Sequence, residues 1–301
     1  MSNYHAPVML TECIDGLNIK PNGVYVDVTY GGGGHSRAIL DQLDESGSLL
    51  VFDQDADAMA NRIDDPRLIF CDANFAYLSN FCSYYNLPQI DGLLADLGVS
   101  SHHLDEGSRG FSFRFDTSSL DMRMNTTADI SAKDIVNTYD QPSLAKVFRR
   151  YGELDKASPI ASAIVTYRSI KSLKTNADLM EAVSKFVSEK SKHKLLAKIY
   201  QALRIEVNQE MQTLESLLEQ ATSLLKPKGR LVVMSYHSLE DRMVKNLIQR
   251  GNVVGERITD HFGNAPQVFK AITKKPIEAS KAEREQNPRA RSAKLRIGEK
   301  I

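Results

Sequence analysis

The chain of 301 residues has few cysteines and no long apolar segment. Cys13, Cys71 and Cys82 have neither the paired count of a disulfide framework nor the spacing of a zinc site, so we expect buried thiols and no bound metal. No apolar run approaches the roughly 20 residues that a membrane-spanning helix needs. The first residues, which include Asn3 and His5, do not resemble a signal peptide. We therefore expect a globular protein of the cytoplasm without a membrane partner.

A glycine-rich loop between a predicted strand and a predicted helix is the first feature that is present. Val24–Thr29 is rich in β-branched residues, Gly31–Gly34 follow, and Ala38–Leu43 has apolar residues at helical spacing. This order is typical of the nucleotide-binding corner of an α/β sheet, although a lone loop of this kind is equally often a simple turn. Ser36 stands where a dinucleotide fingerprint requires glycine, and no G-x-x-x-x-G-K-[ST] sequence occurs. Nicotinamide and P-loop enzymes are thus disfavoured.

Acidic or aromatic residues follow the next three predicted strands. Asp53 ends a strand about 20 residues after the loop, the spacing at which a carboxylate accepts hydrogen bonds from ribose hydroxyls. Phe75 follows Leu68–Cys71, where its ring meets an adenine or belongs to the core. Asp96 ends the strand that begins at Ile90, and it is either a ligand contact at the sheet edge or a helix N-cap.

The formal net charge of zero hides an uneven distribution. Residues 1–130 contain 19 Asp and Glu against 7 Lys and Arg, and this acidic half suits a positively charged sulfonium ligand with an adenosine group, S-adenosylmethionine. Residues 143–204 contain 13 basic against 5 acidic residues, and residues 270–301 contain 10 against 4. Two basic stretches indicate a polyanionic partner, whereas either one alone is better explained as a solvated face or a loose tail.

The middle of the chain changes from an alternating pattern to a helical one. Apolar residues recur at helical spacing in Ile135–Tyr151, Ile160–Ile170, Leu179–Val187 and Leu195–Val207. A helix from about 206 to 225, a turn at Lys226–Gly229 and a strand Arg230–Ser235 then resume the α/β pattern. We predict a discontinuous core of residues 1–108 and 206–301, with a basic C-terminal tail from about 270, and an inserted helical substrate-recognition subdomain of residues 109–205.

Six segments together resemble one protein family along nearly the whole chain. They are Thr29–Ser36, Asp96–Ser101, Gly110–Phe113, Leu120–Met124, Ser235–Arg242 and Asn287–Ser292. In this order they are similar to the bacterial 16S ribosomal RNA cytosine-N4 methyltransferases of the MraW or RsmH family. The resemblance implies a class I methyltransferase fold, a Rossmann-like sheet with a helical insertion, that uses S-adenosylmethionine to methylate a cytidine in the decoding region of 16S rRNA within the small ribosomal subunit. It leaves open whether the protein is a homodimer.

The resemblance also implies a set of cofactor contacts. By motif they fall at Gly33, Gly34, His35, Asp53, Phe75, Asp96 and His103. His103 departs from the family pattern, because this chain has His102-His103 where Pro-Gln is familiar. The pair lacks a spaced third ligand for a metal, so we expect a loop or pocket contact.

Two side chains are candidates for the chemistry on the cytosine amine. This amine is a poor nucleophile, because its lone pair is delocalised into the ring, so an enzyme must align it and accept its proton. Asp96 and His237 stand at the ends of neighbouring predicted strands and are the expected acceptors. For His237, a structural role in anchoring the Ser235–Arg242 turn is an equal alternative.

Basic residues in two regions are the expected phosphate contacts. They are Arg149, Arg150, Arg168, Lys171 and Lys174 in the insertion and Arg289 and Arg291 near the C-terminus. Two other functions stay open, an S-adenosylmethionine-binding sensor and an amino-methyltransferase acting on DNA or a small molecule. The dense motifs at Asp96 and Ser235–Arg242 disfavour the sensor, and Asp96–Val99 lacks the Pro-Pro-Tyr loop common in DNA amino-methyltransferases.

Overall fold

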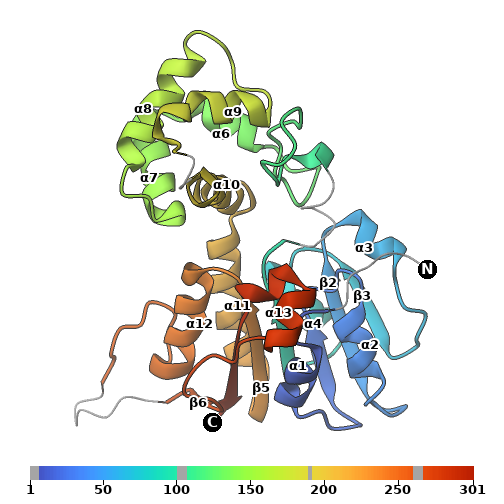
Figure 1. Ribbon diagram of the computed structural model, residues 1–301. Coiled ribbons are helices and arrows are strands. Elements are labelled where there is room, and N and C mark those ends of the chain that lie inside the picture. Colours follow the sequence, from blue (N-terminus) through green and yellow to red (C-terminus); the bar gives the residue numbers. More distant parts are fainter. Residues whose placement is uncertain (1–6, 100–106, 189–191, 260–266) are drawn as a thin grey trace. The chain divides into compact units, whose positions relative to one another are not determined.

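The computed structural model describes residues 7–99, 107–188, 192–259 and 267–301. The chain divides into two compact units, one formed by Met1–Gly98 with Met211–Ile301 and the other by Val99–Glu210 (Figure 1). The boundaries predicted from the helical pattern were 109 and 205, so the second unit begins earlier and ends later than that pattern indicates. Among the described residues no helix is both long and apolar enough to cross a membrane.

The first unit contains a mixed sheet. Its described strands are β1 (Val24–Asp27), β2 (Ser48–Asp53), β3 (Leu68–Asp72), β4 (Ile90–Asp96), β5 (Leu225–Ser235), β6 (Phe269–Ala271) and β7 (Lys294–Lys300). They lie in the order β3-β2-β1-β4-β5-β7-β6, with β1 to β5 parallel and β7 antiparallel to both neighbours. The strand order reverses between β1 and β4, and in open α/β sheets ligands bind outside the carboxyl ends of the strands at such a point.

Helices cover both faces of this sheet. They are α1 (Leu10–Leu17), α2 (Gly34–Leu40), α3 (Ala56–Ala60), α4 (Leu78–Tyr84) after the short η1 (Phe75–Tyr77), α11 (Glu210–Leu224), α12 (Ser238–Arg250) and α13 (Lys281–Gln286), which precedes η4 (Pro288–Arg291). On one face, Leu49 and Val51 pack in one cluster with Cys13 of α1 and Ile39 of α2. On the other, Phe52 meets Phe81 of α4 edge to face. The middle strands are thus buried on both sides, as parallel strands usually are. The predicted α/β fold with a helical insertion is confirmed.

The C-terminal stretch from about 270 is not the loose tail that its charge suggests. It holds β6, α13, η4 and β7, and β7 pairs with β5 over six residues, from Arg230↔Glu299 to Ser235↔Lys294. Leu295 and Ile297 are buried on one face of the sheet, while Arg296 between them forms an ion pair with Asp241 of α12 on the other. The alternation of two basic and two apolar residues in 294–297 is a strand pattern.

The second unit is helical. Its elements are η2 (Gly107–Arg109), α6 (Ala132–Thr138), α7 (Gln141–Gly152), α8 (Ala157–Arg168), α9 (Asn176–Ala182), η3 (Ser184–Phe186) and α10 (Lys192–Asn208). The helix predicted over Ile135–Tyr151 is two helices, because Asp140 caps α7 and Pro142 lies in its first turn. The helix predicted from about 206 is also interrupted, since Gln209 between α10 and α11 has a left-handed φ of 49°.

The turn predicted at Lys226–Gly229 is an irregularity inside β5. Leu225 pairs with Ile90 and Arg230 pairs with Gly92, so four residues of β5 stand opposite one residue of β4. Lys228 takes a left-handed φ of 67°, as expected for a tight bend.

A substitution in β7 tests whether the C-terminal strand is part of the core. Leu295 is fully buried, so Leu295→Ala should lower the free energy of unfolding by about 2–5 kcal/mol through lost burial and a cavity. The highly exposed Lys281 in α13 provides the control, and Lys281→Ala should change stability by less than about 0.5 kcal/mol. Denaturant unfolding measures both. Equal stability of the two variants would contradict the placement of β7 in the core.

Candidate functional site

Four neighbouring parallel strands each end in an aspartate. Across the sheet these are Asp72 of β3, Asp53 of β2, Asp27 of β1 and Asp96 of β4. Because the carboxyl ends of parallel strands meet at one sheet edge, these side chains come from a single edge of the first unit. A row of carboxylates favours a positively charged ligand over a phosphate.

Asp27 organises the loop that follows β1. Its carboxylate is buried, and one oxygen accepts hydrogen bonds from the backbone N–H and the hydroxyl of Thr29, at 3.0 and 3.3 Å. The other oxygen accepts a 2.6 Å hydrogen bond from the hydroxyl of Ser36 in α2. Ser36 is therefore a structural donor at the position where a dinucleotide fingerprint has glycine, and a glycine there would leave this oxygen of Asp27 without that donor.

The glycine loop lies close to Asp53 and Tyr30. The Gly31 N–H donates to Asp53 Oδ2 at 2.8 Å, and the Asp55 N–H donates to Oδ1 at 2.9 Å. Gly33 begins α2 with a left-handed φ of 74°, and a Cβ there would lie 2.7 Å from the Tyr30 hydroxyl. Only glycine satisfies both the conformation and the contact. The loop thus fixes the Asp53 carboxylate at the edge of the sheet.

Phe75 lies beside the ends of β2 and β3. It begins η1 directly after Asn74, whose side chain caps that turn by accepting from the Ala76 N–H at 2.8 Å. The Asn74 amide also donates to Gln54, the residue after Asp53, at 3.2 Å. Phe75 is half-buried.

Asp96 is held by groups from two other strand ends. Its backbone N–H donates to the hydroxyl of Thr29 at 2.7 Å, and its Oδ1 accepts a 2.8 Å hydrogen bond from the Tyr236 hydroxyl. Its Oδ2 lies 3.9 Å from Nδ1 of His35, and the side chain keeps 22% exposure. Burial raises the pKa of Asp96 to about 6, against the opposing effects of His35 and Tyr236. Asp96 is therefore a partly accessible carboxylate that titrates near neutral pH.

His35 links this carboxylate to the N-terminal segment. The ring is buried, and Nε2 lies 3.1 Å from the carbonyl oxygen of Val8. A carbonyl only accepts, so Nε2 carries a proton, while Nδ1 faces Asp96. The next residue, Met9, donates its N–H to Glu283 of α13 at 2.7 Å. The C-terminal part of the chain thus secures the segment that orients His35.

His237 begins α12 directly beyond β5. Its Nδ1 accepts from the backbone N–H of Glu240 at 3.4 Å, and its Nε2 lies 3.2 Å from Glu240 Oε1. Glu240 in return accepts from the N–H groups of Tyr236 and His237, at 2.9 and 3.3 Å. This reciprocal arrangement is a capping box with histidine at the N-cap. The observed contacts are those of the anchoring role that was one alternative for His237.

Sequence reasoning missed Tyr236 and Glu240. Tyr236 directly follows a predicted strand, and its position at a strand end was the available signal. Glu240 stands three residues after His237, the spacing of a capping box, but histidine is not among the usual N-cap residues.

The predicted cofactor residues in the described part of the chain come from the same end of the first unit. The loop residues Gly33, Gly34 and His35 begin α2, Asp53 is bound to Gly31, and Asp96 faces His35. His103 lies outside the described residues.

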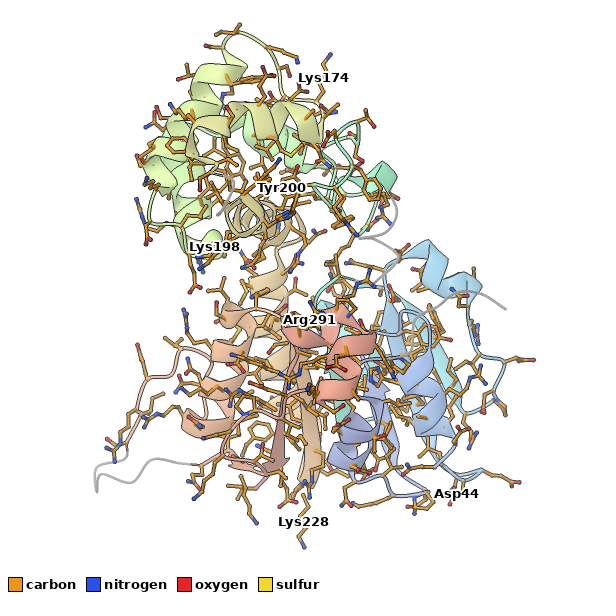
Figure 2. All side chains as sticks on the ribbon, in the orientation of Figure 1. Asp44, Lys174, Lys198, Tyr200, Lys228 and Arg291 are labelled. Carbon is orange, nitrogen blue, oxygen red and sulfur yellow. The ribbon has the colours of Figure 1, made fainter. Side chains whose placement is uncertain are left out.

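The predicted phosphate contacts in the second unit differ in their exposure and in the protein contacts that they make. Arg149, Arg150 and Lys174 are exposed. Figure 2 shows Lys174 pointing outward from the segment before α9. Lys171 forms a 2.6 Å ion pair with Asp178, and Arg168 donates to the Val136 carbonyl at 2.9 Å.

The two predicted phosphate contacts of the first unit lie in η4. Arg291 is exposed, whereas Arg289 is half-buried.

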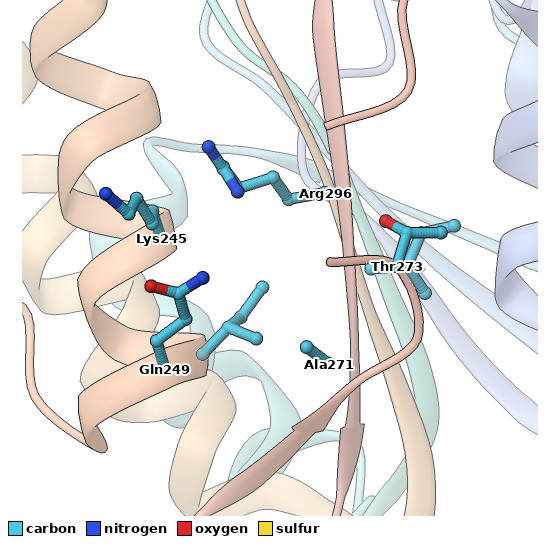
Figure 3. Close-up of a pocket in the computed structure, with 7 residues that line it drawn as sticks. Lys245, Gln249, Ala271, Thr273 and Arg296 are labelled. Carbon is cyan, nitrogen blue, oxygen red and sulfur yellow. The ribbon is translucent and has the colours of Figure 1, made fainter. Parts of the chain in front are cut away.

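A small pocket in the first unit lies apart from these residues. It is between α12 and the β6–β7 side of the sheet, where Lys245 and Gln249 of the helix stand opposite Ala271, Thr273 and Arg296 (Figure 3). Arg296 is already engaged by Asp241 at 2.7 Å. The pocket contains none of the predicted site residues.

The family model and the two relatives below each match nearly the whole chain. The MraW methylase family matches residues 2–301. Ribosomal RNA small subunit methyltransferase H of Bacteroides thetaiotaomicron is 55% identical over 297 residues, covering 99% of this chain and 97% of that protein. The protein of the same name from Flavobacterium johnsoniae is 50% identical over 298 residues, covering 99% and 98%. Among solved structures, an rRNA methylase from Streptococcus thermophilus has a TM-score of 0.39 at 12% identity, covering 97% of this chain and 93% of that one.

The raised pKa of Asp96 has a consequence for stability. The folded state disfavours the ionised carboxylate. Ionisation of Asp96 therefore lowers the stability of the fold, fully above about pH 6, and this loss is absent at pH values well below 4. Asp96→Asn should therefore raise the free energy of unfolding at pH 8 by about 1–3 kcal/mol and leave it nearly unchanged at about pH 3, below both pKa values. Denaturant unfolding at both values measures this, with Asp72→Asn at an exposed strand end as the control. Equal stability of Asp96→Asn and the unaltered protein at pH 8 would contradict the expectation.

Proposed function

The chain belongs to the MraW methylase family, and we propose that it methylates N4 of a cytidine in the decoding region of 16S rRNA. It is an S-adenosylmethionine-dependent rRNA methyltransferase with a class I α/β fold. The observation that supports the proposed chemistry is the position of Asp96, a partly accessible carboxylate at the sheet edge that also carries the glycine loop and Asp53.

The residues at this edge fit S-adenosylmethionine. We propose that Gly33, Gly34, His35, Asp53, Phe75 and Asp96 hold it. Each Asp53 oxygen accepts a backbone hydrogen bond, which orients the carboxylate at the edge where a ribose would lie. The half-buried ring of Phe75 offers a face to the adenine, and the strand-end carboxylates suit a sulfonium. When bound, the cofactor supplies an electrophilic methyl group.

Asp96 is the proposed proton acceptor. Its Oδ1 is engaged by Tyr236, while Oδ2 accepts a hydrogen bond from the target amine, aligns the nitrogen lone pair, and takes the proton that the amine loses. A pKa of about 6 leaves this carboxylate mostly ionised at neutral pH and basic enough to accept that proton. For His237 we now propose the anchoring role, because its Nδ1 is engaged by the Glu240 N–H.

The substrate must present an unstacked base. An amine within a duplex cannot reach a site at a sheet edge, so the cytidine has to turn out of its stack. The helical unit, with exposed Arg149, Arg150 and Lys174, is the proposed substrate-recognition unit, and Arg291 is a further phosphate contact. Arg168, Lys171 and Arg289 remain proposed contacts, although each of them already has a partner within the protein.

The substrate and setting extend this proposal. We propose 16S rRNA within the small ribosomal subunit as the substrate, which places the protein in the cytoplasm. We propose no oligomeric state beyond a possible homodimer, and analytical ultracentrifugation measures whether the protein is a monomer or a dimer.

Transfer of a radiolabelled methyl group to small ribosomal subunits, free rRNA and DNA tests the function. We expect label in ribosomal RNA, and mass spectrometry of nuclease fragments should place it on N4 of one cytidine. Cofactor binding without transfer to any substrate would favour a sensor, and label in DNA alone would favour a DNA amino-methyltransferase.

The salt dependence of RNA binding tests the helical unit. If Arg149 contacts a phosphate, Arg149→Ala should reduce the slope of log affinity against log salt by about one. Lys156→Ala removes another exposed positive charge from the same unit and should change the slope less. Binding titrations at several salt concentrations measure both. The same slope change in both variants would mean that Arg149 acts only through net charge.

A further inference from the structure

Tyr236 makes one contact that the proposed chemistry does not explain. Its hydroxyl donates a 2.8 Å hydrogen bond to Oδ1 of Asp96, from the first residue after β5. We propose that Tyr236 is a positioning residue for methyl transfer, whose hydroxyl fixes the orientation and the ionised form of the Asp96 carboxylate so that Oδ2 meets the target amine. This inference rests on the proposed role of Asp96.

The Tyr236 side chain is fixed at its backbone, its ring and its hydroxyl. Its backbone N–H donates to Glu240 Oε2 at 2.9 Å, so the capping box of α12 sets the direction in which the side chain leaves the chain. The ring lies against Gly98, where a Cβ would approach it to 3.3 Å. The hydroxyl therefore has little freedom to leave Asp96.

The two ends of Asp96 are held by different elements. Thr29 accepts the backbone N–H of Asp96, and Tyr236 donates to its carboxylate. With the main chain and Oδ1 both restrained, rotation about the side-chain bonds is restricted and Oδ2 keeps one direction. Holding an acceptor in one direction contributes to the rate by reducing the entropy lost on reaction.

Other charged groups surround Asp96, and the Tyr236 hydroxyl is one of the groups that favour the ionised form of its carboxylate. The titratable groups that face it are Asp27 at the end of β1, His35 of α2, Cys13 of α1, Glu240 of α12 and Tyr236 itself. Asp27 and Glu240 disfavour a further negative charge, while His35 and the Tyr236 hydroxyl favour it. Removing the hydroxyl should therefore shift the ionisation of Asp96 to higher pH.

The test is the pH dependence of single-turnover methyl transfer by Tyr236→Phe. If the pKa of Asp96 rises by about one unit, the rate at pH 6.5 falls about threefold and the rate at pH 5.5 about eightfold beyond the loss at pH 8.5, where Asp96 is ionised in both proteins and only the lost orientation acts. The transfer is measured at saturating S-adenosylmethionine, because Asp96 also belongs to the proposed cofactor site. Carbon NMR of labelled aspartate, with Asp96 assigned from Asp96→Asn, should show the same shift of about one unit without any turnover.

Tyr25→Phe is the matched control. Tyr25 is also buried, and its hydroxyl accepts from the Lys20 N–H at 2.7 Å near the opposite end of β1. This variant loses the same kind of group far from Asp96, so its pH profile should match that of the unaltered protein. Thermal unfolding checks that both variants are folded.

Two results would overturn the proposal. One is an unshifted Asp96 titration in Tyr236→Phe, which remains measurable by NMR even if transfer is lost. The other is an equal loss of rate at every pH, which indicates a merely structural role. Absence of transfer by the unaltered protein would instead reject the proposed function.

Discussion

The carboxylate of Asp27, buried at the end of β1, accepts hydrogen bonds from Thr29 and from Ser36. These bonds fix both ends of the glycine loop, one at the strand and one at α2. Thr29 in turn accepts the backbone N–H of Asp96, so the same network reaches the neighbouring strand. The positions of the glycine loop and of the proposed proton acceptor therefore depend on one buried group, which is costly to leave unsatisfied.

The carboxylates near this network make an unfavourable electrostatic contribution to the stability of the fold. Four aspartates end adjacent strands, and burial raises the pKa of Asp96 to about 6. A carboxylate with an ordinary pKa at this position would destabilise the folded state less, but it would also be a weaker base. The Tyr236 hydroxyl limits the cost by donating to the ionised form. The proposed role of Asp96 and the stability of the fold are thus opposed, and the hydrogen bonds that Asp96 accepts limit the loss of stability.

Much of the fold was predictable because its signals are local. Apolar strands followed by Asp53 and Asp96, and a glycine loop before a helix, are patterns that can be recognised within a few residues. The role of residues 294–300 was not predictable in this way, because their basic composition obscured the alternation of Leu295 and Ile297. Pairing with β5 is a contact between distant segments, and it makes this stretch a strand.

The sequence by itself determined the fold class, the family and the side chains available for chemistry, since each is recorded in residue types at short or ordered spacings. Only the tertiary structure decided what those side chains face. Ser36 became a donor to Asp27, His237 became a helix cap, and Tyr236 met Asp96 across 140 positions of sequence. Hydrogen bonds act over about 3 Å in space, and the distance between two side chains is set by sheet order, which no local pattern contains.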